Sequence, residues 1–172
     1  MEVVDIPTHS ILDIGSKKID MIIREGNKFD INNVLEMVKT FVETSNLNDK
    51  IKDNIDYTYV NQLYHHCILG GGLVLLAIDD DKIVGMIAGI KSPNIWMLED
   101  ISLREIMFYV DPFYRNGRTA YKLIKEYNNK AQEMLDKQII SSYTMTKTEH
   151  LDQIDYSRFG YNKVEETWAV GI

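Results

Sequence analysis

A strand that must stop at a proline, followed closely by a helix, constrains this chain more than any other stretch. Residues 106–110 (Ile-Met-Phe-Tyr-Val) are β-branched, aromatic or otherwise apolar and predict a strand. Pro112 cannot donate to a sheet ladder, so the strand ends there. After Asn116 and Gly117, apolar residues recur at the spacing of one helix face: Ala120, Leu123, Ile124, Tyr127, Ala131, Met134 and Leu135. The sequence therefore predicts a strand, a tight turn and a helix in direct succession.

The start of that helix is a candidate phosphate-binding site. The first turn of a helix leaves backbone N–H groups unpaired, and the macrodipole adds positive potential there. Arg115 and Arg118 stand beside those donors, which suits a phosphate or a pyrophosphate. The Walker alternative requires G-x-x-x-x-G-K-[ST], and the sequence contains no such run. An ordinary capped helix after a strand is the competing interpretation of the same residues.

This stretch resembles the acetyl-CoA signature of the GCN5-related N-acetyltransferase (GNAT) family. Val110 and Pro112 match its V-x-P start, and Arg115 and Ala120 match the Arg/Gln and Gly/Ala that follow. Arg118 departs from the family pattern, which normally has glycine there; its charge favours pairing with the pyrophosphate over crowding it. The resemblance implies that acetyl-CoA binds along Phe108, Tyr109, Val110, Arg115, Asn116, Gly117, Arg118, Thr119 and Ala120.

Three further stretches resemble the same family in order and spacing. They are an Ile-Arg strand followed by an Asp-started amphipathic helix (residues 22–41), a Lys-Ile-Val-Gly strand (residues 82–89) and a Tyr-x-x-x-Gly-aromatic ending (residues 156–161). Together with the signature they cover residues 21–170. The resemblance implies an α/β (α+β) fold with a mixed, mostly antiparallel central sheet flanked by about four helices. We expect this acetyltransferase domain over residues 21–172, after an irregular N-terminal arm over residues 1–20.

The local patterns predict where the remaining elements lie. We expect strands over residues 21–24, 73–78, 83–90, 103–110, 138–145 and 163–170. We expect helices over residues 31–41 with Asp30 as N-cap, over residues 60–68 with a cap near Asp56 or Thr58, and from Thr148 to Phe159. Residues 44–55 and 91–103 are predicted to be connections, and Gly70 and Gly160 to end helices.

The net charge and the cysteine content limit which binding partners and which cellular compartment are expected. The net charge of −7 argues against broad nucleic-acid binding, which needs a basic face. A single cysteine, Cys67, excludes an internal disulfide and suits a reducing cytoplasm. The N-terminus lacks a signal-peptide pattern, and no apolar run reaches the ~20 residues of a membrane span. We therefore expect a cytoplasmic monomer or homodimer whose partners are acetyl-CoA and an amine, with no nucleic acid and no membrane.

The resemblance also implies the chemistry, which is direct transfer of an acetyl group from acetyl-CoA to an amine. Tyr156 stands where the family places a tyrosine near the CoA sulfur, so it is the expected proton donor to the thiolate, with core packing as the alternative. No metal is expected, because the family needs none and His65 and His66, being adjacent on a helix, cannot chelate together.

Glu105 is the expected general base, with a chain of waters as an equal alternative. Strand alternation puts Glu105 on one face with Met107 and Tyr109, whereas the family often places its carboxylate at the opposite parity. A bulge in this strand would reset the parity. Weaker candidates for the base are Glu99, Asp100 and His150, and candidates to shape the acceptor pocket are Tyr57, Tyr59 and Trp96.

Two functions remain open at this point. The first is an acetyl-CoA-dependent N-acetyltransferase acting on a primary amine of a small molecule or a protein. The alternative is a catalytically weak or inactive acyl-CoA-binding or protein-interaction module on the same fold. Arg118 and the parity of Glu105 favour the module, whereas retention of Arg115, Ala120 and Tyr156 favours the enzyme.

Overall fold

A single five-stranded sheet forms the centre of the computed structural model, which describes residues 21–45, 47, 49–115, 118–147 and 154–166. The strands are β1 (Ile22–Glu25), β2 (Gly72–Asp79), β3 (Lys82–Pro93), β4 (Ile101–Val110) and β5 (Ser142–Thr144). They lie in chain order across the sheet. Neighbours from β1 to β4 pair antiparallel, and β5 pairs parallel with β4. The mixed, mostly antiparallel sheet expected from the sequence is therefore confirmed.

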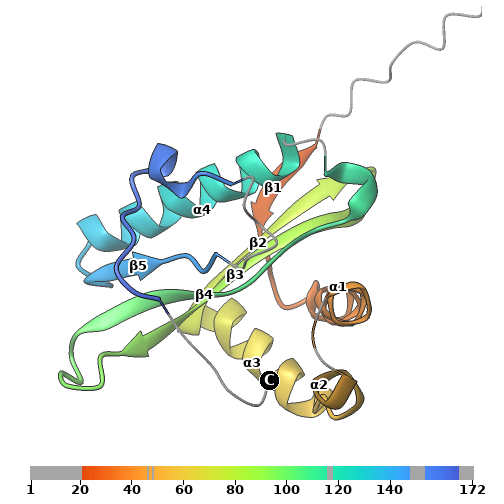
Figure 1. Cartoon of the computed structure of the whole chain (residues 1–172), viewed down its shortest axis with the longest axis horizontal. Coiled ribbons are helices and arrows are strands. Elements are labelled where there is room, and N and C mark those ends of the chain that lie inside the picture. The colour runs from red at the N-terminus through yellow and green to blue at the C-terminus, as the bar shows by residue number, and fades with distance from the viewer. Residues whose placement is uncertain (1–20, 46, 48, 116–117, 148–153, 167–172) are drawn as a thin grey trace, which may run out of the picture.

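The α-helices lie on both sides of this sheet, with the last of them on one side and the others on the opposite side (Figure 1). They are α1 (Ile31–Thr44), α2 (Asp49–Asp53), α3 (Tyr57–His66) and α4 (Arg118–Asp136). Side chains from α1 and α3 pack on one face of the sheet and form the first core cluster. Side chains from α4 pack on the other face and form the second. None of the helices in the described ranges is long and apolar enough to span a membrane.

The predicted long helix of the signature is α4, and its apolar stripe is the reason it packs where it does. Leu123, Ile124, Tyr127 and Ala131 are almost completely buried against the sheet. The strands predicted over residues 73–78 and 83–90 are present as β2 and β3, and Asp80 and Asp81 adopt positive φ in the turn between them. Two residues with positive φ form the type of turn that matches the twist of paired strands.

Helix ends agree with the prediction in two places and differ in one. Asp56 caps α3, accepting from the backbone N–H groups of Thr58 and Tyr59. Gly160 adopts the left-handed conformation expected of a helix stop. Asp30 precedes α1 but makes no side-chain cap. Its carboxylate accepts instead from both terminal nitrogens of Arg24, each at 2.7 Å, because a paired guanidinium competes better than a helix N–H.

The rest of the predicted elements are shorter or displaced. The connection predicted over residues 44–55 contains the short helix α2, and the strand predicted over residues 138–145 is reduced to β5. Residues 163–166 are not in a strand, so that part of the prediction is wrong; residues 167–170 lie outside the described part of the chain. Of the helix predicted from Thr148 to Phe159, the structure has a 3₁₀ turn at Tyr156–Phe159, and residues 148–153 are not described. The arm at residues 1–20 also lies outside the described ranges.

A bulge in β4 separates the two halves of that strand. Gly89 of β3 pairs with Glu105, and Ala88 pairs with Met107, so Ile106 is left without a partner in the ladder. One extra residue reverses the side-chain alternation on either side of it. Leu103 accordingly packs in the α4 cluster, whereas Met107 and Tyr109 pack in the cluster with α1 and α3. This bulge decides which face of the sheet carries Glu105.

Candidate active site

The candidate site lies at the point where strands β4 and β5 diverge. The two strands pair only at Ser102, Leu103 and Arg104, opposite Ser142, Tyr143 and Thr144. From Glu105 to Val110, β4 pairs with β3 on one side and, within the described ranges, with no strand on the other. An unpaired strand edge exposes backbone donors and acceptors that an extended ligand can pair with.

Glu105 lies at the point of divergence. Its register partner Gly89 is a glycine at which an added Cβ would overlap the hydroxyl of Tyr127, a residue of α4. Directly paired residues of an antiparallel ladder share a face, so the Glu105 side chain lies on the α4 face. The sequence-based grouping of Glu105 with Met107 and Tyr109 is therefore wrong. The bulge that the sequence analysis allowed for is present and resets the parity.

Burial changes the acidity of Glu105. Its side chain is mostly buried, and it accepts a hydrogen bond from the backbone N–H of Thr146 at 3.1 Å. Burial raises the pKa of Glu105 to about 7, against the lowering effect of hydrogen bonds from Thr146. A carboxyl group with this pKa is suited to proton transfer at neutral pH.

Tyr156 is joined to Glu105 through the same peptide segment. Its hydroxyl donates to the carbonyl of Thr146 at 3.4 Å, while the Thr146 N–H donates to Glu105. Burial, followed by the negative charge of Glu105, raises the pKa of Tyr156 to about 12. The structure thus brings together the two residues that the sequence analysis selected for catalysis.

Tyr161 lies beside Tyr156 and Tyr143 lies beside Tyr161, and neither is among the site residues predicted from the sequence. The ring of Tyr161 lies 6.0 Å from that of Tyr156 and 5.6 Å from that of Tyr143, edge-on in both cases. Burial raises the pKa of Tyr161, as do its tyrosine neighbours and Glu105. In the sequence, Tyr161 is the aromatic residue that ends the Tyr-x-x-x-Gly-aromatic motif, and nothing in its spacing indicates that it lies near Glu105.

Tyr127 is the residue that sequence reasoning missed most clearly. It is 0% exposed, and its hydroxyl lies over Gly89 on the face that carries Glu105. The hydroxyls of Tyr127 and Tyr161 are both buried with no hydrogen-bond partner among the described residues. In the sequence, Tyr127 is one member of the apolar stripe of α4. A hydroxyl group within an apolar stripe is the signal that could have identified Tyr127 as a site residue, because a buried tyrosine hydroxyl usually has a hydrogen-bond partner.

The turn from β4 into α4 forms the second half of the site. Arg115 donates from Nε to the carbonyl of Val110 at 2.8 Å, and its guanidinium lies 5.5 Å from the ring centre of Tyr109. Tyr114 donates to Asp79 at 2.9 Å. These contacts hold the turn against the ends of β4 and β2, and Arg115 as a whole is exposed.

The first turn of α4 holds the remaining signature residues that are described. Arg118 is exposed, Ala120 is partly buried, and Thr119 is completely buried with a hydroxyl that has no partner among the described residues. Phe108 and Val110 lie in the α4 cluster. Asn116 and Gly117 fall outside the described ranges. A helix start with a nearby arginine and an unsatisfied buried hydroxyl is chemically suited to a phosphate group.

The weaker candidates lie elsewhere. Glu99 lines a cavity that contains neither Glu105 nor Tyr156, and Asp100 is bonded to Asn94 in the turn between β3 and β4. Trp96 is 85% exposed in that same turn. Tyr57 and Tyr59 are exposed on α3, and His150 lies outside the described ranges. Over the described part of the chain, no cluster of His, Cys, Asp and Glu side chains is arranged to hold a metal ion.

Comparison with known proteins identifies the family. The model of the acetyltransferase (GNAT) family matches residues 37–161, which is most of the chain. The chain belongs to this family. The match includes β2 to β4, the signature and the Tyr156–Tyr161 segment. A search of curated proteins found no match.

Solved structures of GNAT-fold proteins share the architecture at low identity. A predicted acetyltransferase with acetyl-CoA from Clostridium acetobutylicum is 13% identical, with a TM-score of 0.62 over 88% of this chain and 96% of its own. A ribosomal-protein-alanine N-acetyltransferase from Brucella melitensis is also 13% identical, with a TM-score of 0.63 over 88% and 99%. An aminoglycoside acetyltransferase from an uncultured soil metagenomic sample is 16% identical, with a TM-score of 0.62 over 88% and 94%. These likenesses show the fold.

The unsatisfied hydroxyl of Tyr127 leads to a prediction about stability. Tyr127→Phe keeps the buried ring and removes a polar group that has no partner, so it should raise the free energy of unfolding by about 1–3 kcal/mol. Chemical denaturation monitored by circular dichroism measures this. Tyr64→Phe is the matched control, because the buried Tyr64 hydroxyl donates to the sulfur of Met107 at 3.1 Å. A Tyr127→Phe protein less stable than wild type would contradict the assignment.

Proposed function

We propose that this protein is an acetyl-CoA-dependent N-acetyltransferase that moves an acetyl group directly to a primary amine of a small molecule or a protein. The observation that carries the proposal is the pairing of Glu105 and Tyr156 across one peptide unit, Thr146, beside the unpaired edge of β4. One residue is a carboxyl group with a pKa near neutrality, and the other is a phenol that retains its proton. These are the base and the acid that acetyl transfer from a thioester to an amine needs.

The free edge of β4 and the start of α4 support a continuous binding surface for acetyl-CoA. The pantetheine arm carries amide groups and can pair with the edge of β4 at Phe108, Tyr109 and Val110, as an added strand would. The pyrophosphate then meets the first turn of α4, where Thr119 and Ala120 supply N–H groups. Arg115 and Arg118 add positive charge from the two ends of the turn, and Asn116 and Gly117 belong to the same proposed surface.

The reaction follows from the two protonation states. A primary amine is mostly protonated at neutral pH, so Glu105 accepts a proton from it, directly or through water. The neutral nitrogen attacks the acetyl carbonyl, and the C–S bond of the tetrahedral intermediate breaks. Tyr156 gives its proton to the leaving thiolate, which forms CoA. The nitrogen loses its second proton as the amide forms, and the Tyr156 phenolate takes it up, while Glu105 releases its proton to solvent. The proposed reaction uses no metal.

The proposed acceptor is an amine that belongs either to a small molecule or to a protein. GNAT-fold neighbours with an aminoglycoside and with a ribosomal-protein alanine in their names have equal TM-scores to within 0.01. The net charge of −7 favours the approach of a cationic acceptor. A panel of polyamines, aminoglycosides and peptides with free α-amino or lysine groups, assayed by CoA release, tests the proposal. Firm acetyl-CoA binding with no turnover of any amine would favour the acyl-CoA-binding module instead.

The first prediction of the proposed function concerns acetyl-CoA binding at the turn before α4. Arg115→Ala should weaken acetyl-CoA binding by about 1.5–3 kcal/mol, the range for a charge-assisted hydrogen bond. Titration calorimetry measures the change at low salt. Arg104→Ala, which removes an exposed arginine from β4 outside the proposed surface, should leave the affinity unchanged. If the two variants bound acetyl-CoA with equal affinity, the placement of the phosphates at this turn would be wrong.

The second prediction concerns the pH dependence set by Glu105. The base must be deprotonated to act, so kcat/KM of the wild type should rise with pH and level off above a midpoint of about 7. Glu105→Gln should lower kcat by roughly 10²–10⁴ and abolish this limb. Glu43→Gln removes an exposed carboxylate of α1. It should retain the wild-type kcat and the rising limb of the pH profile.

Stability gives an independent check on the same group. The folded-state pKa of about 7 lies above the ordinary value of 4.5, so the folded protein binds more protons between these two values. The stability contribution of Glu105 therefore falls as the pH rises from about 4.5 to 7 and is constant above that. The free energy of unfolding of Glu105→Gln minus that of the wild type should therefore be larger at pH 8 than at pH 4, by roughly 2–3 kcal/mol. A pH-independent difference would show that the pKa of Glu105 is not raised.

The third prediction separates an enzyme from a binding module. Tyr156→Phe keeps the ring, so the acetyl-CoA affinity and the melting temperature should barely change. If Tyr156 protonates the thiolate, kcat should fall by roughly 10²–10⁴. Tyr143→Phe is the matched control, because its hydroxyl donates to Gln132 instead of to the Thr146 segment. Wild-type turnover in Tyr156→Phe would reduce that residue to a packing role.

A further inference from the structure

The turn between β3 and β4 presents four consecutive apolar side chains to solvent. Ile95, Trp96, Met97 and Leu98, here called the hairpin tip, are 80%, 85%, 57% and 80% exposed. Single exposed apolar residues are normal on a protein surface, whereas a contiguous group that includes tryptophan is typical of an interaction site. The hairpin extends past β5 at one end of the sheet (Figure 1).

Hydrogen bonds hold the backbone of this turn in one shape. Asn94 donates to the Asp100 carbonyl from its backbone N–H at 2.8 Å and to the Asp100 carboxylate from its side chain at 2.9 Å. The Asn94 side-chain oxygen accepts from the N–H of Trp96 at 2.9 Å. Because the turn is ordered before any partner arrives, binding costs little backbone entropy there.

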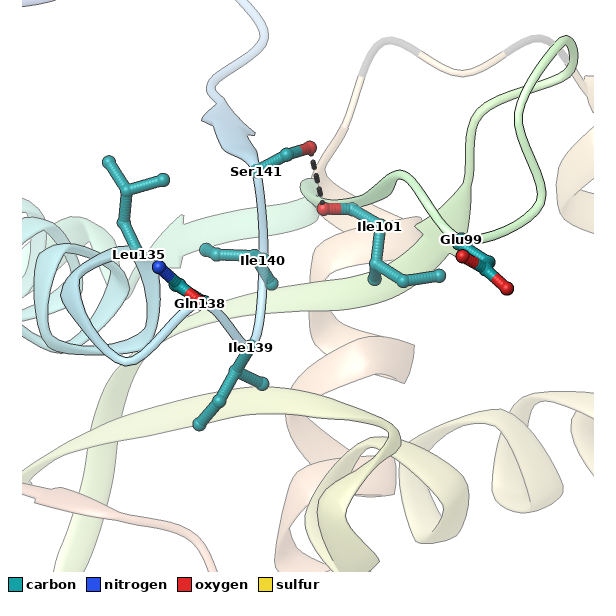
Figure 2. A pocket seen from close by; sticks show the side chains of 7 residues that line it. All are labelled: Glu99, Ile101, Leu135, Gln138, Ile139, Ile140 and Ser141. Atoms are coloured by element: carbon teal, nitrogen blue, oxygen red, sulfur yellow. Dashed lines mark hydrogen bonds between the residues drawn. The ribbon is translucent and has the colours of Figure 1, made fainter.

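A cavity of about 310 Å³ lies at the base of the hairpin, and its lining is mixed. The start of β4 forms one side, and the end of α4 with the segment that follows forms the other (Figure 2). Its apolar residues are Ile101, Leu135, Ile139 and Ile140, and its polar residues are Glu99, Gln138 and Ser141. Among these, Glu99 alone carries a charge. Apolar walls beside one carboxylate suit a side chain with an aliphatic stem and a cationic end, as in lysine and arginine.

Gln138 lines this cavity in a strained backbone conformation. It follows α4 with a φ of 57°. Its N–H donates to the Leu135 carbonyl, and the N–H of Ile139 donates to the Met134 carbonyl, both at 2.9 Å. These two bonds form a Schellman motif, in which glycine is the usual residue at the left-handed position. A non-glycine residue there favours a role for its side chain.

The hairpin tip and the cavity lie on the acceptor side of Glu105. In the proposed binding of acetyl-CoA, the cosubstrate lies along the half of β4 that ends at Val110, with its thioester near Glu105. The acceptor nitrogen therefore arrives from the other half of β4, which starts at Ile101. Ile101 and Glu105 are four positions apart, a separation of roughly 13 Å along a strand. A few residues of extended polypeptide span that distance.

We propose that the acceptor is a polypeptide with a basic, partly apolar segment that docks here, its apolar residues on the hairpin tip and a lysine or arginine side chain in the cavity. Its role as acceptor rests on the proposed function, whereas the docking does not. Charge favours such a partner, because Glu99 and Asp100 directly follow the hairpin tip and the chain carries a net charge of −7. Lys137 is exposed at the end of α4 but is not part of the cavity lining.

Titration calorimetry of the full chain with a synthetic peptide tests the docking. The probe has one arginine between two leucines in a serine background. Trp96→Ala should raise its Kd by roughly thirtyfold or more, the effect of removing a tryptophan from the centre of an interface. Phe29→Ala is the matched control, because Phe29 is 81% exposed outside the hairpin. No saturable binding to the wild type, or equal affinities of Trp96→Ala and Phe29→Ala, overturns the proposal.

The cavity is tested with the same peptide. Glu99→Gln should raise the Kd about two- to fivefold, as expected for an exposed ion pair, whereas Glu43→Gln on α1 should not. Replacing the arginine of the peptide by citrulline keeps the stem, removes the charge and should weaken binding to the wild type equally. Gln138→Gly relieves the backbone strain, so the melting temperature should not fall, yet the Kd should rise by roughly two- to tenfold. Wild-type affinity in both Glu99→Gln and Gln138→Gly removes the cavity from the docking site.

Acetylation of the peptide separates this proposal from the proposed function. Agmatine, a small amine with a guanidinium end, serves as the comparison in binding and in CoA release. Trp96→Ala should raise KM for the peptide, whose α-amine is free, and leave kcat and the KM for agmatine unchanged. Agmatine that binds as tightly as the peptide would make the cavity a small-molecule site and overturn the polypeptide acceptor. Peptide binding without CoA release from any amine would keep the docking and overturn the acetyltransferase activity.

Discussion

The bulge at Ile106 is the constraint on which the candidate site depends. Without it, strand alternation would turn Glu105 toward α1 and α3, in the direction of Met107 and Tyr109. With it, the carboxyl group lies on the α4 face at the point where β4 and β5 separate. The same residue that disrupts the ladder thus gives Glu105 its buried surroundings, and burial is the main cause of its raised pKa. Bulges commonly redirect side chains next to active sites.

The packing of α4 completes these surroundings at some cost in stability. Gly89 has no side chain, which lets the hydroxyl of Tyr127 approach the sheet opposite Glu105. That hydroxyl and the one on Tyr161 are buried and unpaired, which an optimally stable core would avoid. Unsatisfied polar groups that gather around one carboxyl group are the kind of local conflict found at functional sites. The cluster is more easily explained by chemistry at Glu105 than by folding.

The parts of the fold that the sequence predicted are those with a strong period or a turn that only certain residues allow. The stripe from Ala120 to Leu135 predicts α4, and the apolar runs at residues 73–78 and 83–90 predict β2 and β3. The family resemblance predicts the mixed, mostly antiparallel sheet. Local patterns failed where a distant partner decides the outcome: Asp30 pairs with Arg24 instead of capping α1, and β5 keeps only the three residues that meet β4.

The orientation of Glu105 belongs to the same class of failure. A bulge leaves no mark in the sequence of β4, because it arises from the register of β3 against β4 and not from any residue type. The approach of Tyr127 to Gly89 is likewise a contact between residues 38 positions apart, numbered 89 and 127, on elements that the sequence places separately. Sequence therefore identified Glu105 and Tyr156 as candidates, and three-dimensional packing explains why their pKa values suit the proposed roles.

The link between those two residues has a consequence for the order of proton transfers. The negative charge of Glu105 raises the pKa of Tyr156, so the phenol is a weaker acid while the base is still ionised. In the proposed reaction, that charge is lost when Glu105 takes a proton from the amine, which lowers the pKa of Tyr156, although burial still holds it above its ordinary value. The proposed acid thus becomes stronger as the proposed thiolate leaves. Under the proposal, the two groups act in sequence, base first and acid second.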